Sequence, residues 1–331
     1  MCVLQLLSSK RIQSFRNVRD EEVALLIQRI KDSPSKVINL KNLFATLANN
    51  IVCRVALGKK YEGGRGVAFK KLLEELSELL SYSGLGIYIP WLYWVDNFKG
   101  VKRRVEKVAN ELDDFLEGVV TDHIIALENN GAVNQDFVSI LLENLKKKTD
   151  NGFSIDKECI KAVTMDMFTA GTNTTSSTLE WTMAMLMKNP DIMDKLQNEV
   201  RNISRGNTRI LEDDLQDMQY LKAVIKESMR INTPTTLLSR KAREDVKVMG
   251  YEIKARTRVF INVWAIARDP TLWDNPEEFW PERFLNNPID YKGLHFEYLP
   301  FGAGRRGCPG IQFGMAVNEL ALANVVNTFN F

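Results

Sequence analysis

The sequence predicts a mainly α-helical protein with a small β-sheet. Apolar residues recur at three- and four-residue spacing over most of the chain, which is typical of amphipathic helices. Alternating β-branched and aromatic residues occur in two short stretches, at 245–253 and 257–266. The chain has 331 residues and 45% hydrophobic content, enough to bury a sizeable core in one large domain or two ordinary ones.

The first half of the chain reads as a series of helices. Charged residues separate the periodic apolar positions at 23–30, 69–80, 101–128 and 137–148. An irregular connection rich in glycine, proline and aromatic residues interrupts the series at 84–100. The longest helical run extends from about 155 to 188 and ends at Asn189-Pro190, because proline disfavours helical backbone in the residue before it.

The second half combines further helices with the strand-like segments. Helices are predicted at 191–204 and 213–231, and the two strands follow, with a turn at Gly250-Tyr251. A long irregular segment with five prolines then leads to a glycine-rich loop at 301–310 and a final helix at 311–326.

Composition excludes several classes of function. Lys plus Arg number 44 against 42 Asp plus Glu, so no strong net charge favours nucleic acid as a partner. Four scattered cysteines are too few for a disulfide framework or paired zinc spacings, which favours a reducing compartment. Two distant histidines, His123 and His295, argue against a multi-histidine metal site or a histidine-centred hydrolase. No apolar stretch approaches the roughly 20 residues of a membrane span.

The segment FGAGRRGCPG, residues 301–310, is the most informative in the chain. Cys308 stands at the start of the final helix, where unpaired N–H groups and the helix dipole favour thiolate over thiol. Glycines let the backbone bend tightly and approach a flat ligand closely. A lone cysteine is more often an inert core residue. Here the glycines, the dipole and the adjacent Arg306 favour a functional role.

This loop resembles the haem-binding loop of the cytochrome P-450 monooxygenases, Phe-x-x-Gly-x-Arg-x-Cys-x-Gly. The matching residues are Phe301, Gly304, Arg306, Cys308 and Gly310. The resemblance implies haem b as the cofactor and Cys308 as the axial thiolate ligand of its iron. It further implies that Phe301 packs near the sulfur, that Gly310 belongs to the cofactor-binding loop, and that Arg306 pairs with a haem propionate.

A second motif is KESMR, in which Glu227 and Arg230 are three residues apart and therefore share a helix face. Taken alone, the pair reads as an ordinary surface ion pair worth under about 1 kcal/mol. The P-450 family carries Glu-x-x-Arg on the corresponding helix, joined by an arginine from Pro-Glu-Arg-Phe, which is Arg283 here. The resemblance implies a structural triad that locks the core around the cysteine loop.

A third motif is AGTNTTSS, residues 170–177, in the middle of the longest helical run. Small and hydroxyl residues disfavour a helix interior, and close packing against a neighbour would explain them. The resemblance instead implies the distal helix over the haem, with Thr174 as the dioxygen-facing hydroxyl. Asn173 stands where the family has an acid, so we expect slower or leakier oxygen activation than with Asp.

The segment after the Glu-x-x-Arg helix is expected to line the substrate side of the haem. Its predicted substrate contacts, together with Ala170 of the distal helix, are Thr233, Thr235, Thr236 and Leu237, with Leu238 beside them. Lys241 stands where a propionate-binding arginine is usual and Arg240 is adjacent, so the cofactor contact stays open between the two.

The resemblance spans residues 1–331, as a single partial domain incomplete at both ends, and points to plant enzymes of specialised metabolism. The membrane anchor and first sheet strands of the family are expected to be absent from this chain. The complete protein is expected on the cytosolic face of the endoplasmic reticulum membrane. NADPH would supply electrons through a cytochrome reductase, and no nucleic acid is expected as a partner.

The resemblance implies a monooxygenase that inserts one oxygen atom from O2 into a small apolar plant metabolite, a furanocoumarin precursor or a terpenoid. Two alternatives stay open. The chain is a truncated, non-catalytic fragment unable to hold haem, or it is a haem enzyme that rearranges an oxidised substrate without a reductase.

Overall fold

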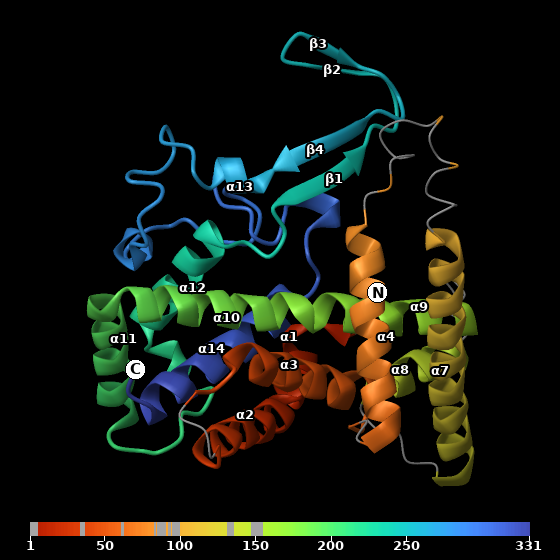
Figure 1. The fold of residues 1–331 in the computed structure, drawn as a ribbon, viewed down its shortest axis with the longest axis horizontal. Helices are drawn as coiled ribbons and strands as arrows, with labels where there is room; N and C mark the ends of the chain where they lie inside the picture. The colour runs from red at the N-terminus through yellow and green to blue at the C-terminus, as the bar shows by residue number, and fades with distance from the viewer. Residues whose placement is uncertain are drawn as a thin grey trace. The chain divides into compact units, whose positions relative to one another are not determined.

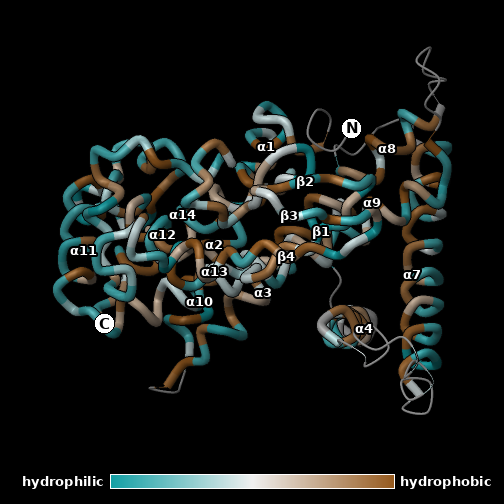
Figure 2. Tube along the Cα trace, turned by 90° about the horizontal axis from the view of Figure 1, so that it is seen from above, coloured by the Kyte–Doolittle hydropathy of each residue, from teal (hydrophilic) through white to brown (hydrophobic). Residues whose placement is uncertain are grey.

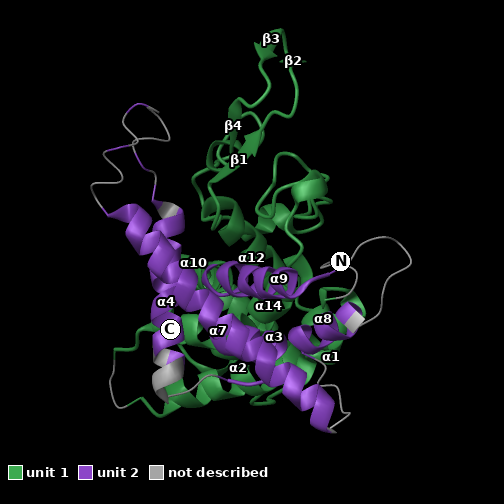
Figure 3. Cartoon of the chain, turned by 90° about the vertical axis from the view of Figure 1, so that its right-hand side faces the viewer, with its two compact units in different colours: residues 1–47, 174–331 green, residues 48–173 purple. Residues whose placement is uncertain are grey.

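A computed structural model describes residues 6–331 except 34–36, 61–62, 83, 85–90, 92–93, 95–99, 131–135 and 147–154. The predicted mainly α-helical fold is confirmed (Figure 1). The chain divides into two compact units, residues 1–47 with 174–331 and residues 48–173 (Figure 3). The single-domain expectation stays a prediction, and the predicted connection at 84–100 lies largely outside the described residues.

The first unit is built around its last helix. Its helices are α1 (Ser9–Ser14), α2 (Arg16–Lys31), most of α10 (Asn173–Lys188), α11 (Pro190–Ser204), α12 (Gln219–Ile231), α13 (Val263–Ile266) and α14 (Ile311–Thr328), with short 3-10 turns η3 (Asp214–Gln216), η4 (Pro281–Phe284) and η5 (Gly304–Arg306). Helix α14 packs against α1, α2, α11 and α12 and is buried over most of its length. Such a helix, apolar on nearly every side, forms the centre of a helical core.

The described strands of the first unit form two separate antiparallel pairs. β1 (Leu237–Lys241) pairs with β4 (Arg258–Asn262), and β2 (Val246–Val248) pairs with β3 (Tyr251–Ile253) (Figure 1). The predicted strand at 257–266 is wrong beyond Asn262, whose side-chain oxygen accepts the Ala265 N–H at 3.0 Å and begins α13. No strand is predicted from the sequence at Leu237–Lys241, because LLSRK does not alternate apolar and polar residues.

A buried ion pair anchors α2 within the first unit. The Arg19 side chain has 1% exposure and donates to Glu212 with both Nε and Nη2, while Nη1 donates to the Ile12 carbonyl at 2.8 Å. A guanidinium whose donors are satisfied in this way tolerates burial, whereas removing its carboxylate partner would leave an uncompensated charge.

The second unit consists of α4 (Gly63–Ser81), α7 (Val101–Asn130), α8 (Phe137–Lys146), α9 (Lys157–Gly171) and most of α3 (Leu40–Leu57). Hydrophobic residues follow one side of α7 and hydrophilic residues the other (Figure 2). The buried side packs against α4, α8 and α9. Phe69 of α4 stacks on Phe115 of α7, with ring centroids 4.2 Å apart, and meets Phe168 of α9 edge-on at 4.9 Å.

Within the part of the chain that the structure describes, no helix is both long enough and apolar enough to cross a membrane.

His123 connects α7 to Asp136, the residue that precedes α8. Its Nδ1 lies 2.8 Å from the Val119 carbonyl, and its Nε2 lies 3.4 Å from Asp136, whose carboxylate accepts the Ser139 N–H at the start of α8. At Gly58, beyond α3, an added Cβ would lie 2.8 Å from the same carboxylate, so this close approach requires glycine. Burial lowers the pKa of His123, but the hydrogen bonds with Asp136 and Val119 raise it, and the net shift is upward.

Because the pKa of His123 is higher in the folded chain than its ordinary 6.5, the cation stabilises the fold below pH 6.5. That contribution is lost as the pH rises through the folded pKa. We expect urea unfolding at a series of pH values from 5.5 to about 9 to show a falling stability, and His123→Gln to remove this part of the slope. An unchanged slope in the variant would contradict the assignment to His123.

Candidate functional site

The cysteine loop is held in a tight conformation by its own backbone. The Cys308 N–H donates to the Phe301 carbonyl at 2.9 Å and closes the loop. Gly302 and Gly304 both have a φ of +68°, which other residues rarely adopt. The Gly310 N–H, at the start of α14, donates to the Cys308 sulfur at 3.3 Å. The loop therefore presents an exposed thiol at the amino-terminal end of α14.

Partial burial raises the pKa of the Cys308 thiol, and the Gly310 N–H lowers it by a smaller amount. The Gly310 N–H acts in the direction expected of a helix terminus, while desolvation of the sulfur acts in the opposite direction. A metal cation bound at the sulfur would stabilise the thiolate, because a coordinating thiol loses its proton. The exposed sulfur and the side-chain-free glycines around it fit an iron-bearing flat group such as haem.

Strand β1 decides which basic residue faces the loop. Its side chains alternate, so Leu238 and Arg240 are half-buried on one face while Leu237 and Lys241 are exposed on the other. A Cβ at Gly302 would lie 3.6 Å from Leu238 Cδ1 and 4.0 Å from Arg240 Nη2. The geometry favours Arg240 over Lys241 as the basic neighbour of the loop.

The other predicted loop residues have different surroundings. The Phe301 ring packs edge-on against Tyr291, with centroids 5.6 Å apart. Arg306 is exposed at the end of η5, where the described residues offer its guanidinium no hydrogen bond or ion pair. Ahead of β1, Thr233 is buried and its hydroxyl donates to the Thr235 carbonyl at 3.5 Å, whereas Thr235 and Thr236 are exposed.

The residues predicted as a structural triad are assembled around one buried carboxylate. Arg230 donates to Glu227 through Nε at 2.8 Å and Nη2 at 2.9 Å, and both side chains have 0% exposure. Arg283 Nε and the Trp280 N–H each donate to the same Glu227 oxygen at 3.0 Å. The surface-pair interpretation is wrong at this site, because four donors converge on a carboxylate that has no access to water.

The two guanidiniums extend the network to backbone carbonyls. Arg230 donates to the Ala267 carbonyl at 2.5 Å and the Glu278 carbonyl at 3.2 Å, and Arg283 donates to the Asp274 carbonyl at 2.9 Å. Both also lie over the Trp273 ring, at 5.2 Å and 5.9 Å from its centroid. The irregular segment 267–283 is thereby attached to α12 without regular secondary structure.

An aromatic cluster joins this network to the cysteine loop. Trp273, Phe284 and Tyr298 pack together, with centroid separations between 5.1 and 6.3 Å. The Tyr298 hydroxyl donates to the Lys226 carbonyl at 2.8 Å, immediately before Glu227. Tyr291 packs against the same cluster and carries the Phe301 contact. Sequence reasoning missed these tyrosines, because nothing in their local pattern separates them from other aromatics of the proline-rich segment.

The predicted distal helix is interrupted. Helix α9 ends at Gly171 and α10 begins at Asn173, with Thr172 between them. The Thr172 N–H reaches the Phe168 carbonyl only at 3.4 Å, and its buried hydroxyl oxygen has no hydrogen-bond partner among the described residues. The Asn173 side-chain amide donates to the Ser77 hydroxyl of α4 at 2.8 Å. Ala170 is exposed near the end of α9.

Thr174 is exposed and belongs to the first unit, as does Cys308. Its carbonyl accepts the Thr178 hydroxyl at 2.9 Å. One turn further, the buried Thr182 hydroxyl donates to the Thr178 carbonyl at 2.7 Å and lies 2.9 Å from the Ser228 hydroxyl of α12. Helix α10 is thus tied by a buried polar contact to the residue next to Glu227.

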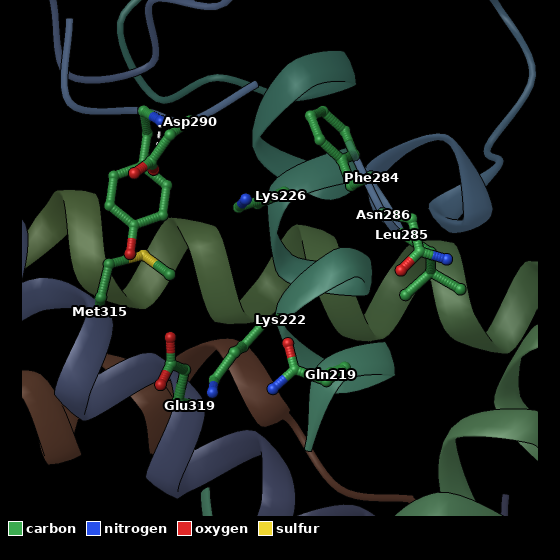
Figure 4. A pocket seen from close by; sticks show the side chains of 10 residues that line it. Gln219, Lys222, Lys226, Phe284, Leu285, Asn286, Asp290, Met315 and Glu319 are labelled. Atoms are coloured by element: carbon green, nitrogen blue, oxygen red, sulfur yellow. Dashed lines mark hydrogen bonds between the residues drawn. The ribbon is translucent and has the colours of Figure 1, made fainter. Parts of the chain in front are cut away.

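A cavity of about 310 Å³ lies between α12, α14 and the segment after η4 (Figure 4). It is lined by Gln219, Lys222, Lys226, Phe284, Leu285, Asn286, Asp290, Tyr291, Met315 and Glu319. Burial raises the pKa of Glu319 to about 7, although Lys222 and Lys226 oppose the shift. Two ammonium groups and two carboxyl groups line this cavity, and the raised pKa leaves the Glu319 carboxyl partly protonated near neutral pH.

The sequence model of cytochrome P-450 matches residues 1–331. The chain belongs to the cytochrome P-450 family. Psoralen synthase of Pastinaca sativa is 57% identical to this P-450 chain over 100% of the chain and 69% of that protein. Psoralen synthase of Ammi majus is 54% identical over 100% and 66%, and (+)-menthofuran synthase of Mentha piperita is 47% identical over the same shares. The P-450 chain spans about two thirds of the length of these curated relatives.

A zebrafish cytochrome P-450 solved with progesterone has the same fold, with a TM-score of 0.81 at 24% identity over 96% of this chain and 70% of that one. Together these findings confirm the predicted family, its resemblance to plant enzymes of specialised metabolism, and the oxidoreductase class, that of a monooxygenase. Membership of the family also implies a haem cofactor.

The triad should dominate the stability of the first unit. We expect Glu227→Gln to lower the free energy of unfolding by about 3–5 kcal/mol, because it leaves two buried guanidiniums without their carboxylate. Lys102→Ala is the control, since its ammonium pairs with Glu106 at 3.9 Å on the surface and should change stability by less than about 1 kcal/mol. Urea unfolding of the three proteins measures the difference, and equal stabilities would contradict the structural role.

Proposed function

We propose that this chain forms the haem-thiolate part of a monooxygenase that inserts one oxygen atom from O2 into a small apolar plant metabolite. The observation that carries the proposal is the exposed Cys308 thiol, which accepts the Gly310 N–H at the start of α14 inside a closed glycine loop. A bound haem thiolate supplies an electron-rich iron at which dioxygen is activated.

The residues of the chain would hold the haem and neutralise its charged groups. Cys308 would supply the thiolate that holds the haem iron, and the Gly310 N–H, which donates to the sulfur, would disperse part of its negative charge. Arg240, which faces the loop, and Arg306, whose guanidinium is exposed, pair with propionates. The Phe301 ring packs on Tyr291, and the Phe301 carbonyl accepts the Cys308 N–H. Lys241, on the opposite face of β1, keeps its charge in solvent.

The distal and substrate-side residues have roles that we infer from the family motif. Thr174 would provide a hydroxyl that holds a proton on the distal side of the haem, and Asn173 precedes it where the family has an acid. Ala170, Thr235, Thr236 and Leu237 contact substrate, and the exposure of the last three supports that role. Thr233 acts through its contact with the Thr235 carbonyl, because its own side chain is buried.

The substrate class and partners follow from the relatives. Two psoralen synthases and a menthofuran synthase are among them, which supports a furanocoumarin precursor or a terpenoid-like compound as substrate. Electrons come from NADPH through a cytochrome reductase, on the cytosolic face of the endoplasmic reticulum. In this proposal residues 1–331 act as one partial P-450 domain of the complete protein.

Replacing the proposed ligand should remove the spectrum of a haem thiolate. We expect the haem-reconstituted chain to show a red-shifted Soret band in its ferrous–CO spectrum. Cys308→Ser should abolish this band, whereas Cys159→Ser, a substitution on α9, should keep it. The same chain extended by the segments of the Pastinaca sativa relative outside the matched region is measured in parallel. A band in the extended protein alone supports the fragment alternative, and no band in either contradicts the haem proposal.

A second prediction follows from the alternation of side chains along β1, which separates Arg240 from Lys241. Arg240→Leu should weaken haem retention about tenfold, the effect of losing one charge-assisted contact, whereas Lys241→Leu should leave it within about twofold. Haem loss to excess apomyoglobin, followed by absorbance, measures the retention. Equal loss rates for the two variants would contradict the assignment of Arg240.

A further inference from the structure

Asn173 makes a specific contact that an ionised carboxylate at the same position could not make, because a carboxylate has no donor. Its Nδ2 donates to the Ser77 hydroxyl of α4 at 2.8 Å, across 96 residues of sequence and within one compact unit. We propose that Asn173 is a positioning residue whose amide clamps α4 to the break between α9 and α10. In this proposal the amide is required as a hydrogen-bond donor.

The proton count at Ser77 explains why the partner must be a donor. The Ser77 hydroxyl donates its single proton to the Leu73 carbonyl, one turn earlier on α4, at 2.8 Å. Its oxygen is left to accept, and the Asn173 amide occupies that position. An Asp at 173 would bring an acceptor to a hydroxyl whose proton is already used. Ser77 would then lose either its contact with residue 173 or its contact with Leu73.

The Asn173–Ser77 hydrogen bond lies at the end of the face of α4 that packs on its neighbours. Phe69, Leu73 and Ser77 are spaced by four residues and share one face of α4. Phe69 and Leu73 are buried, and Phe69 packs edge-on against Phe168 of α9. The hydrogen bond to Asn173 continues this contact beyond the last turn of α9.

Helix α3 also restricts the backbone at the break between α9 and α10. A Cβ added at Gly171 would lie 3.1 Å from Val52 of α3, so α3 approaches the backbone closely there. Thr172 itself is weakly held, with an N–H contact of 3.4 Å to Phe168 and a buried hydroxyl without a partner in the described chain. The Asn173–Ser77 hydrogen bond therefore supplies directional restraint at the point where the helix ladder is weakest.

The consequence for chemistry rests on the proposed function. Thr174 follows Asn173 directly, so a restraint on residue 173 fixes the backbone from which the proposed distal hydroxyl projects. Asn173 then acts through position and not by proton transfer. This is the opposite of the sequence-based expectation, in which an acid at 173 improves oxygen activation.

The test compares Asn173→Asp, Ser77→Ala and their double variant. Hydrogen exchange of the unliganded proteins reports the clamp, and the ratio of product to NADPH consumed in the reconstituted enzyme reports positioning. We expect each single variant to speed exchange at residues 73–81 about three- to tenfold, the effect of one hydrogen bond, and to lower the coupling ratio. The double variant should be no worse than either single one, because both remove the same contact.

Two controls complete the design. Ser77→Thr keeps the hydroxyl and should retain wild-type exchange, and Lys70→Gln changes an exposed residue of the same helix and should also retain it. The proposal is overturned if Asn173→Asp leaves hydrogen exchange at residues 73–81 unchanged or raises the ratio of product to NADPH consumed. It is also overturned if this variant speeds exchange but leaves that ratio unchanged. If the wild-type protein gives no thiolate spectrum, the proposed function fails, and the exchange comparison by itself still supports or overturns the clamp.

Discussion

The rest of the first unit depends on the hydrogen-bonded ion pairs that the buried Glu227 carboxylate makes. A carboxylate removed from water is tolerated only when its oxygens are fully paired, and here two arginines and a backbone N–H supply the donors. The same guanidiniums hold the carbonyls of a segment that has almost no regular structure. One charge cluster thus replaces the ladder hydrogen bonds that a helix or strand would provide.

The cysteine loop receives its order from this cluster by contact. Glycines free the loop to bend around a flat ligand, and the same freedom leaves it few side chains with which to fix itself. The Tyr298 hydroxyl donates to the backbone carbonyl beside Glu227. Tyr291 packs against the aromatic cluster that contains Tyr298, and Phe301 packs on Tyr291. The Glu227 network therefore contacts the aromatic cluster, and the aromatic cluster in turn contacts the glycine-rich loop that carries Cys308.

Similarity to the zebrafish structure at 24% identity shows that the fold tolerates extensive substitution. Buried apolar periodicity, which many residue types satisfy, maintains the helical scaffold. The break after Gly171 is different in kind, because it depends on single polar contacts and on close backbone approach. Differences in chemistry among relatives are thus expected at such positions and not in the core helices.

The sequence by itself determined the helices, whose apolar periodicity is local, and the identities of Cys308, Glu227, Arg230 and Arg283, whose spacing matches a specific motif. The tertiary structure decided which residue each of them meets. Alternation along β1 places Arg240 beside the cysteine loop, an asparagine cap ends β4 at Asn262, and Ser77 is the partner of Asn173. Spacing along the chain reports only neighbours within a few residues, whereas these outcomes depend on contacts between segments far apart in sequence.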